Sequence, residues 1–310
     1  MLPAYPSQLP RNFGGLDERD SRYERSAVVV WPIPLERTTT YKAGTRHGPA
    51  AILEASRNME LYDEELRTEP FRCGIHTLPE METQVGPMEK ILADLHTVAS
   101  GLLADGKFVV ALGGEHSLTP PLVAACARKF PSLSVLQIDA HADLRDTYED
   151  NPHSHACAMR RVLEICPAVQ VGIRSLSQEE GEALPHLNNT RLFYAQHVVG
   201  QPPERWVPEV IAALSENVYL TLDVDGLDPS IVPATGTPEP GGLGWYEVLA
   251  LLQAVASQKH VVAMDLVELL PQPGFHACDF LCAKLAYKMV GYVMQGRASD
   301  LPARKGPGTA

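Results

Sequence analysis

Short apolar segments alternate with longer amphipathic segments along most of this 310-residue chain. The apolar segments are rich in β-branched residues and rarely alternate with polar ones, as expected for strands buried on both faces. These candidate strands lie at 26–34, 71–78, 108–112, 133–139, 168–173, 191–195, 217–223 and 261–267, the second being the weakest. Hydrophobic residues recur with a helical period at 87–105, 119–130, 208–214, 245–258 and 278–294.

The repeated order of strand, helix and strand predicts the fold class. Parallel strands joined by helices need right-handed crossovers, which place helices on both faces of the sheet. The pattern therefore predicts an α/β protein with an open, mainly parallel, doubly wound sheet, although a closed barrel would produce a similar pattern. A chain with 45% hydrophobic residues favours one large domain, expected over 1–295. The last residues, 296–310, lack periodicity and are expected to form a disordered tail.

Composition and charge restrict the partners. No apolar run reaches the roughly 20 residues that span a bilayer, and the first residues lack the regions of a signal peptide, so a soluble cytoplasmic protein is expected. A net charge of −12 without basic clusters excludes nucleic acid and anionic membranes as partners and is compatible with a cationic small molecule. The six cysteines are scattered, which favours buried free thiols over a disulfide framework or structural zinc.

Polar side chains follow three of the predicted strands. In an extended segment, residues i, i+2 and i+4 share one face, so the "DAHAD" segment presents alternate side chains together. The segments "GGEHS" and "DVDG" follow two other strands, and the carboxyl ends of parallel strands line one crevice. Together the three segments contribute His116, Asp139, His141, Asp143, Asp223 and Asp225.

This set of ligands indicates a metal centre. Four unpaired carboxylates would repel one another and raise their own pKa values, unless a cation lies among them. Carboxylates and imidazoles without thiolates suit Mn²⁺, with Co²⁺ and Ni²⁺ as alternatives. Six ligands exceed the needs of one ion with an open position, so we infer two ions about 3.5–4 Å apart. Each motif alone is also typical of a turn or helix cap, but their combination is not.

At these residues the sequence resembles the ureohydrolase family of arginases and agmatinases. The resemblance lies in "GGEHS" (113–117), "DAHAD" (139–143) and "LDVDGLDPSIVPATGTPEPGGL" (222–243), and also in "GTRHGPAAI" (44–52), "SHACAMRR" (154–161) and "DLVELLP" (265–271). It implies a three-layer α/β/α fold with an eight-stranded, mainly parallel sheet, two Mn²⁺ ions per subunit held by the six residues above, and a homo-oligomer, commonly a trimer or hexamer.

The resemblance also implies a reaction, the hydrolysis of a guanidinium group to urea and an amine. Asp143 matches the residue that passes a proton to the leaving amine, and His155 matches a histidine that moves protons between solvent and site. Glu268 matches the glutamate that holds the guanidinium by a charge-assisted contact. Thr237 matches a loop position near the metal centre.

Two positions bear on the substrate. Arg145 stands where arginases typically have an asparagine, and Ser177 stands where they have an acid for the α-amino group, so arginine is disfavoured. The segment 139–161 resembles agmatinases, which implies conversion of agmatine to putrescine, a step of polyamine biosynthesis. Asp146, Glu149 and Asp150 suit a cationic tail, although a solvated acidic turn explains them equally well. N1-aminopropylagmatine, guanidinobutyrate and formiminoglutamate remain alternatives.

Other classes of protein fit less well. A metallophosphoesterase would carry a "GNH" metal motif, and a deacetylase of related fold would carry adjacent histidines; the chain has neither. A non-enzymatic relative would be expected to have lost ligands, whereas all six candidates are present together with His155 and Glu268. A binuclear hydrolase acting on a small cationic guanidino substrate is therefore the function that the sequence predicts.

Overall fold

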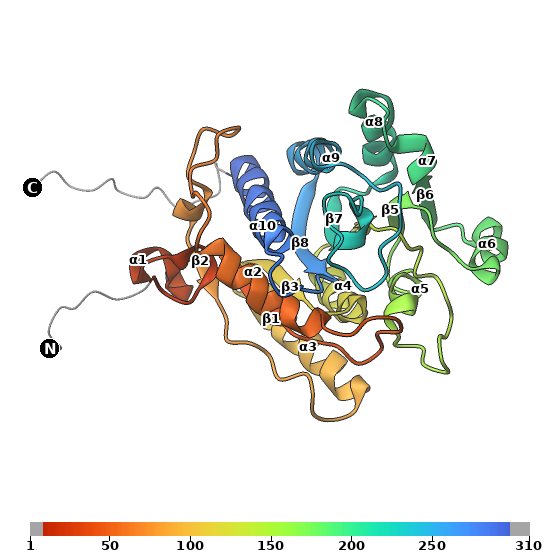
Figure 1. Cartoon of the computed structure of the whole chain (residues 1–310), viewed down its shortest axis with the longest axis horizontal. Coiled ribbons are helices and arrows are strands. Elements are labelled where there is room, and N and C mark those ends of the chain that lie inside the picture. Colours follow the sequence, from red (N-terminus) through yellow and green to blue (C-terminus); the bar gives the residue numbers. More distant parts are fainter. Residues whose placement is uncertain (1–8, 298–310) are drawn as a thin grey trace, which may run out of the picture.

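The computed structural model describes residues 9–297, which are built around one eight-stranded sheet (Figure 1). The strands lie side by side in the order β2-β1-β3-β8-β7-β4-β5-β6, and every pairing is parallel. Their bounds are β1 Val28–Ile33, β2 Ile75–Thr77, β3 Phe108–Gly113, β4 Leu133–Ile138, β5 Ala168–Ile173, β6 Thr190–Tyr194, β7 Asn217–Asp223 and β8 His260–Val267. The predicted parallel α/β sheet is confirmed, and because β2 and β6 form its two edges it is open rather than a barrel.

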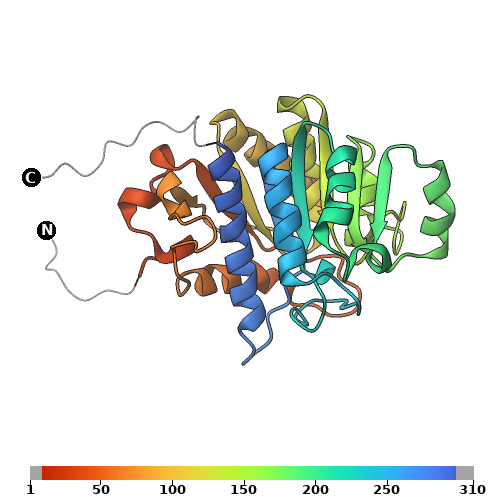
Figure 2. The same cartoon turned by 90° about the horizontal axis from the view of Figure 1, so that it is seen from above.

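Helices cover both faces of the sheet, as Figure 2 shows from above. Helices α2 (Gly48–Ser56), α8 (Pro203–Ala213), α9 (Trp245–Gln258) and α10 (Ala277–Gly296) pack over one core cluster. Helices α3 (Met88–Ala104), α4 (Thr119–Lys129) and α5 (Ala158–Val162) pack over the other. Three short helices complete the set: α1 Glu18–Ser21, α6 Gln178–Ala183 and α7 Ala195–Val198. The strands are apolar nearly throughout because side chains on both faces meet these two cores.

Two elements begin more than three residues away from their predicted starts. The weak strand at 71–78 shortens to β2, because a 3-10 helix at Pro70–Cys73 occupies its first half. Helix α8 begins at Pro203 rather than at residue 208 and continues through Pro208. The lost backbone hydrogen bond is offset by burial of Trp206, which lies before the predicted start.

The ends of the chain bear on two expectations. The expected tail at 296–310 lies outside the described residues from position 298 onward, and α10 reaches its first residue. Within 9–297, no helix combines the length and the apolar character that crossing a membrane requires. The six cysteines all fall in the described part of the chain and are free thiols.

Candidate metal centre and substrate pocket

Four neighbouring strands in the middle of the sheet end at the candidate site. Strand β3 leads into a 3-10 helix, η5 (His116–Leu118), and β4 leads into Asp139. Strand β7 ends at Asp223 and continues into a second 3-10 helix, η8 (Val224–Gly226), while β8 leads to Glu268. Because β3, β8, β7 and β4 are adjacent and parallel, their carboxyl ends share one edge, and the segments after them converge there.

Two glycines allow the close turns that bring these segments together. A Cβ atom on Gly114 would lie 2.1 Å from the carbonyl oxygen of Leu35, and one on Gly226 would lie 2.8 Å from the backbone nitrogen of Asp139. Any larger residue would therefore push the chain away from its neighbour. The "GG" and "DVDG" motifs thus position the polar residues beside them.

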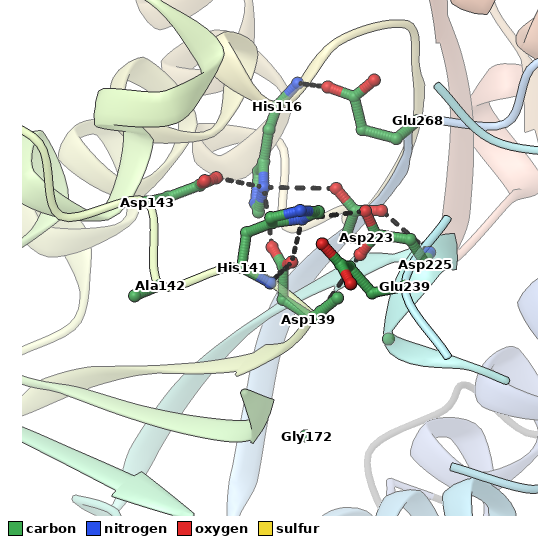
Figure 3. A network of polar contacts seen from close by, with 12 residues as sticks. His116, Asp139, His141, Ala142, Asp143, Gly172, Asp223, Asp225, Glu239 and Glu268 are labelled. Carbon is green, nitrogen blue, oxygen red and sulfur yellow. Dashed lines mark hydrogen bonds and ion pairs between the residues drawn. The ribbon is translucent and has the colours of Figure 1, made fainter. Parts of the chain in front are cut away.

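His116 faces a group of carboxylates through one ring nitrogen (Figure 3). Its Nδ1 atom lies 3.0 Å from Asp143 Oδ2, 3.2 Å from Asp139 Oδ2 and 3.6 Å from Asp223 Oδ2. The ring is 1% exposed, yet Nδ1 makes no well-aligned hydrogen bond to any of these oxygens. A buried polar atom without a partner is unusual in a protein, and this one also faces three carboxylate oxygens, an arrangement that a cation would satisfy.

A second group shares Asp139 with the first. His141 Nδ1 lies 3.0 Å from Asp225 Oδ2 and 3.6 Å from Asp139 Oδ1. His141 is partly exposed to the pocket, whereas the two aspartates are buried. Backbone amides orient these carboxylates, because the nitrogen of His141 donates to Asp139 and that of Ala140 donates to Asp225. The structure therefore brings all six predicted ligands together in two overlapping groups.

The charges of this cluster are unbalanced without a cation. Burial, together with the charges of Asp225 and Asp139, raises the pKa of Asp223 well above its usual value, and burial and Asp139 raise the pKa of Asp225 to about 6. Burial lowers the pKa of His141, but Asp225 and Asp139 outweigh it and raise that pKa to about 12. The protein part of the site therefore favours any arrangement that adds positive charge.

The residues present fit divalent metal ions. Asp139, shared by the two groups, has carboxylate oxygens that face both, which suits a ligand common to two ions. Imidazole nitrogen and carboxylate oxygen are donors that Mn²⁺ and similar ions accept. The unpartnered Nδ1 of His116 and the buried carboxylates around it are the atoms that a cation would satisfy.

His155 and Glu268 lie together beside the cluster. His155 Nδ1 lies 3.4 Å from Glu268 Oε1, and the same oxygen accepts a hydrogen bond of 2.8 Å from the backbone nitrogen of His116. Burial lowers the pKa of His155, but Glu268 outweighs it and raises that pKa to about 9. His155 and Glu268, two of the three residues that the sequence linked to catalysis, are therefore in contact with each other, and Glu268 also contacts the segment that carries His116.

Two residues of the site have a left-handed backbone. Asp143 has φ 53° and Glu268 has φ 65°, a conformation that non-glycine residues adopt at a cost of about 1–3 kcal/mol. The backbone nitrogen of Glu268 donates to Gly114 across β3 and β8, and the carbonyl of Asp143 accepts from Arg160, so both positions are held by their neighbours. This strain directs both carboxylates toward the cluster.

Glu115 is a buried residue whose role the sequence did not reveal. Its carboxylate accepts hydrogen bonds from the backbone nitrogens of Arg37 and Thr38 and from the hydroxyls of Thr38 and Ser117. The Thr38 hydroxyl in turn accepts from the backbone nitrogen of His155. Glu115 therefore links the loop after β1 to the segment that carries His155, and its place beside His116 in "GGEHS" was the available signal.

Arg174 also supports the site from outside the predicted set. Its guanidinium donates to backbone carbonyl oxygens of Asp225 and Glu239, at 2.6 and 2.8 Å, and of Gly172 at 3.0 Å. Satisfying carbonyls from several loops at once is what the five donors of arginine allow. The side chain thus ties η8 to the glycine-rich loop at 233–244.

A cavity of about 250 Å³ opens above the cluster. It is lined by Thr40, His141, Ala142, Asp143, Arg145, Tyr148, His155, Ala156, Ser175, Leu176, Glu180, Asp223, Asp225, Thr237 and Glu268. Arg145 lies 4.8 Å over the ring of Tyr148 and 3.9 Å from Glu180 Oε2. Arg145 and Thr237, which were both predicted to contact the substrate, thus line the pocket. Glu180 lines it as well, although the sequence did not predict this.

Ser177 and the acidic loop occupy other positions. The Ser177 hydroxyl accepts from the backbone nitrogen of Glu180 and caps α6, and it is Ser175 and Leu176 that line the cavity. Asp146 is exposed and pairs with Arg160 and Arg161. Glu149 and Asp150 are exposed as well and lie outside the lining, which favours the solvated acidic turn.

An open parallel sheet with this cluster at its central strand ends defines an α/β protein with a candidate metal centre. The family is shown by a model described as the arginase family, which matches residues 26–291; the chain belongs to that family. The resemblance to ureohydrolases is therefore confirmed.

Individual relatives agree with the family. The chain is 44% identical over 283 residues to an N(1)-aminopropylagmatine ureohydrolase of Synechocystis sp., a match covering 89% of this chain and 92% of the relative. It is 33% identical to an agmatinase of Halalkalibacterium halodurans, over 81% of this chain and 86% of that one. The solved agmatine ureohydrolase of Thermoplasma volcanium superposes with a TM-score of 0.83 at 30% identity, covering 94% and 96% of the two chains.

Proposed function

We propose that this chain hydrolyses the guanidino group of a linear cationic amine, agmatine or its N1-aminopropyl derivative, releasing urea and an amine. The observation that carries the proposal is the cluster around His116 Nδ1, a buried nitrogen without a partner among three carboxylates, which opens into a pocket shared with Glu268 and His155. Membership of the arginase family supports the reaction class.

Metal ions would be held by His116, Asp139, His141, Asp143, Asp223 and Asp225. We propose two Mn²⁺ ions; when bound, such ions supply a nucleophile by lowering the pKa of water. The rest of the chemistry belongs to side chains that line the cavity. The Glu268 carboxylate would bind the guanidinium, because an anion at the pocket wall attracts and orients a planar cation.

Two side chains would move protons. Asp143 lies at the cluster and lines the pocket, so its carboxylate is placed to deliver a proton to the nitrogen of the leaving amine. His155 is partly exposed and contacts Glu268, so its imidazole connects solvent with the interior of the site. The left-handed backbone of Asp143 keeps its carboxylate at the pocket instead of in the bulk solvent.

The far wall of the pocket bears on the substrate. The charge of Arg145 is already balanced by the Glu180 carboxylate, 3.9 Å away, and by the ring of Tyr148, so this wall offers no free cation. This pairing disfavours guanidinobutyrate, whose anionic tail would need a free cation. A tail with one or two ammonium groups fits the wall better.

The length of the cationic tail distinguishes the two candidate substrates, agmatine and N1-aminopropylagmatine. Agmatine is the substrate predicted from the sequence, and the relative named agmatinase is 33% identical. A specific observation favours N1-aminopropylagmatine as a second candidate, because the relative that carries its name is 44% identical over 89% of this chain. We propose that the enzyme accepts both and prefers the longer amine.

The test is urea release from agmatine, N1-aminopropylagmatine, arginine and guanidinobutyrate by protein reconstituted with Mn²⁺. The first two should release urea, with the larger kcat/KM for the longer amine. Asp94→Asn, a change at an exposed carboxylate on α3, is the control and should behave as wild type. Absence of urea from all four compounds would refute the reaction, and arginine as the best substrate would refute the substrate class.

The proposal extends to the location, the assembly and the metal of the protein. We infer a cytoplasmic homo-oligomer, a trimer or hexamer, that holds two Mn²⁺ ions per subunit, with Co²⁺ or Ni²⁺ as the alternative metals. Metal analysis of protein purified without added metal, together with light scattering, tests the last two. Family membership and the carboxylate-rich cluster support the metal centre.

A further inference from the structure

Asp265 is a buried carboxylate that no step of the proposed reaction uses. It lies on β8, is 0% exposed and is absent from the pocket lining. Three hydroxyl groups donate to it: Thr119 Oγ1 at 2.8 Å and Tyr219 Oη at 2.6 Å to Oδ2, and Thr221 Oγ1 at 2.6 Å to Oδ1. Both carboxylate oxygens of Asp265 therefore act as acceptors inside the protein.

These hydrogen bonds to Asp265 determine which nitrogen of the His116 ring carries a proton. The Thr221 hydroxyl has one proton, and that proton is donated to Asp265. Thr221 Oγ1 also lies 2.8 Å from His116 Nε2, so at this contact the oxygen can only accept. His116 must then carry a proton on Nε2. In the neutral ring this leaves Nδ1 with its lone pair, on the side that faces the carboxylates.

We propose that Asp265, acting through Thr221, is a positioning residue that selects the tautomer and orientation of His116 as a metal ligand. The inference rests on the proposed function in one respect, that a metal ion is held at Nδ1. Without the chain of bonds, either nitrogen of His116 could carry the proton and the ring could rotate. Partners behind a ligating histidine raise its basicity and hold its ring.

Asp265→Asn gives the sharpest test, because the amide is nearly isosteric. Its oxygen should face the two donors Thr119 and Tyr219, which places its NH₂ group toward Thr221. Thr221 would then accept from the amide and turn its own proton toward His116 Nε2. The neutral ring would be driven to the opposite tautomer, in which Nδ1 carries the proton and cannot bind a metal.

The measurements are metal affinity and the position of the histidine proton. Competition with a chelator should show Mn²⁺ affinity lowered by about 10–100-fold in Asp265→Asn. In Zn²⁺-loaded protein labelled with ¹⁵N-histidine, the wild type should show a proton on His116 Nε2, and the variant should lose that signal.

Three further variants separate positioning from packing. Tyr219→Phe removes one of the three bonds to Asp265 but leaves the link through Thr221, so it should change Mn²⁺ affinity by less than about 3-fold. Thr221→Val removes the link itself and should lose affinity as Asp265→Asn does, whereas Thr221→Ser should restore it. Thr221→Val keeps the proposal testable if Asp265→Asn fails to fold.

Specific outcomes would overturn the proposal. These are an unchanged Mn²⁺ affinity with a retained Nε2 proton in Asp265→Asn, or an equal loss in Tyr219→Phe. The result is independent of the urea assay: dependence of metal affinity on Asp265 in a protein that releases no urea would support the positioning role while refuting the proposed reaction.

Discussion

At the scale of single residues, His116 Nδ1 and the carboxylates around it explain why this site needs a cation. Removing a buried polar atom from water costs about 1–3 kcal/mol when it finds no partner, and Nδ1 finds none in the protein. The ionised form of the carboxylates is also unfavourable, since burial and mutual repulsion raise the pKa values of Asp223 and Asp225. One positive charge between them would remove both costs.

Asp143→Ala should lose metal and activity together. Asp143 Oδ2 is the carboxylate oxygen nearest His116 Nδ1, at 3.0 Å, so its removal takes away one ligand and the proposed proton donor. We expect urea release to fall by at least about 100-fold and Mn²⁺ content to fall with it. Asp146→Ala, three residues along at an exposed position, should retain both. An inactive variant with full metal content would assign Asp143 to proton transfer alone.

His155 should make the stability of the metal-free protein depend on pH. Its pKa is raised to about 9 in the folded state, because Glu268 outweighs burial. The protonated form therefore stabilises the fold fully below pH of about 6.5, and this contribution is lost as the pH rises through about 9. Between pH of about 6.5 and 9.5 the wild type should lose about 3 kcal/mol more than His155→Asn. Urea denaturation of both proteins across this range measures the difference; parallel curves would contradict it.

At the scale of elements, tight turns after the central strands determine where the ligands lie. Gly114 comes so close to the carbonyl oxygen of Leu35 that a side chain has no room, and the same turn leads into η5 and His116. Glu115 holds the neighbouring loop at Thr38, and that loop holds His155. The turn after β3 thus places one metal ligand and one residue of the proposed catalytic pair.

Gly114→Ala should destabilise the protein and weaken metal binding. Its Cβ would lie 2.1 Å from Leu35 O, so the loop after β1 and the turn after β3 must separate, and a cost of about 1–3 kcal/mol is expected. Gly101→Ala is the matched control: it lies inside α3 with no atom within 4 Å of the added Cβ, and should be stabilised by about 0.5–1 kcal/mol. Thermal unfolding and Mn²⁺ titration of both variants provide the measurement. Equal stability of the two variants would show that the turn adjusts freely.

At the scale of the whole molecule, the order of the strands assembles the site. Strands β3 and β8, and strands β7 and β4, are neighbours in space although other strands lie between them along the chain. Their parallel pairing brings the four segments that follow these strands to one edge of the sheet. The helices on both faces exclude water from the side chains of the strands. The site therefore forms only when the four central strands are paired, and metal binding should stabilise the whole sheet.

Metal removal should lower the stability of the entire fold. A ligand that binds only the folded state adds RT ln(1 + [L]/Kd), about 2.7 kcal/mol at 100-fold excess over Kd. We expect chelated protein to unfold at a lower temperature in one cooperative transition, and added Mn²⁺ to reverse the shift. Asp143→Ala should show a smaller shift, which serves as the control. A midpoint that ignores both chelator and Mn²⁺ would contradict the metal centre.

The sequence by itself determined the parallel α/β fold and the choice of the six candidate ligands. Both follow from local sequence patterns. Apolar runs of strand length indicate strands that are buried on both faces of a sheet, and the two-residue spacing in "DAHAD" places alternate side chains on the same face of the chain. Tertiary structure alone decided which strands are neighbours, how Glu115 and Arg174 support the loops, and that Ser177 caps a helix. It also connected Asp265 on β8 with His116 in η5 through Thr221 on β7, although Asp265 and His116 are 149 positions apart in the sequence. Contacts of this kind depend on strand order, and no local pattern of residues encodes that order.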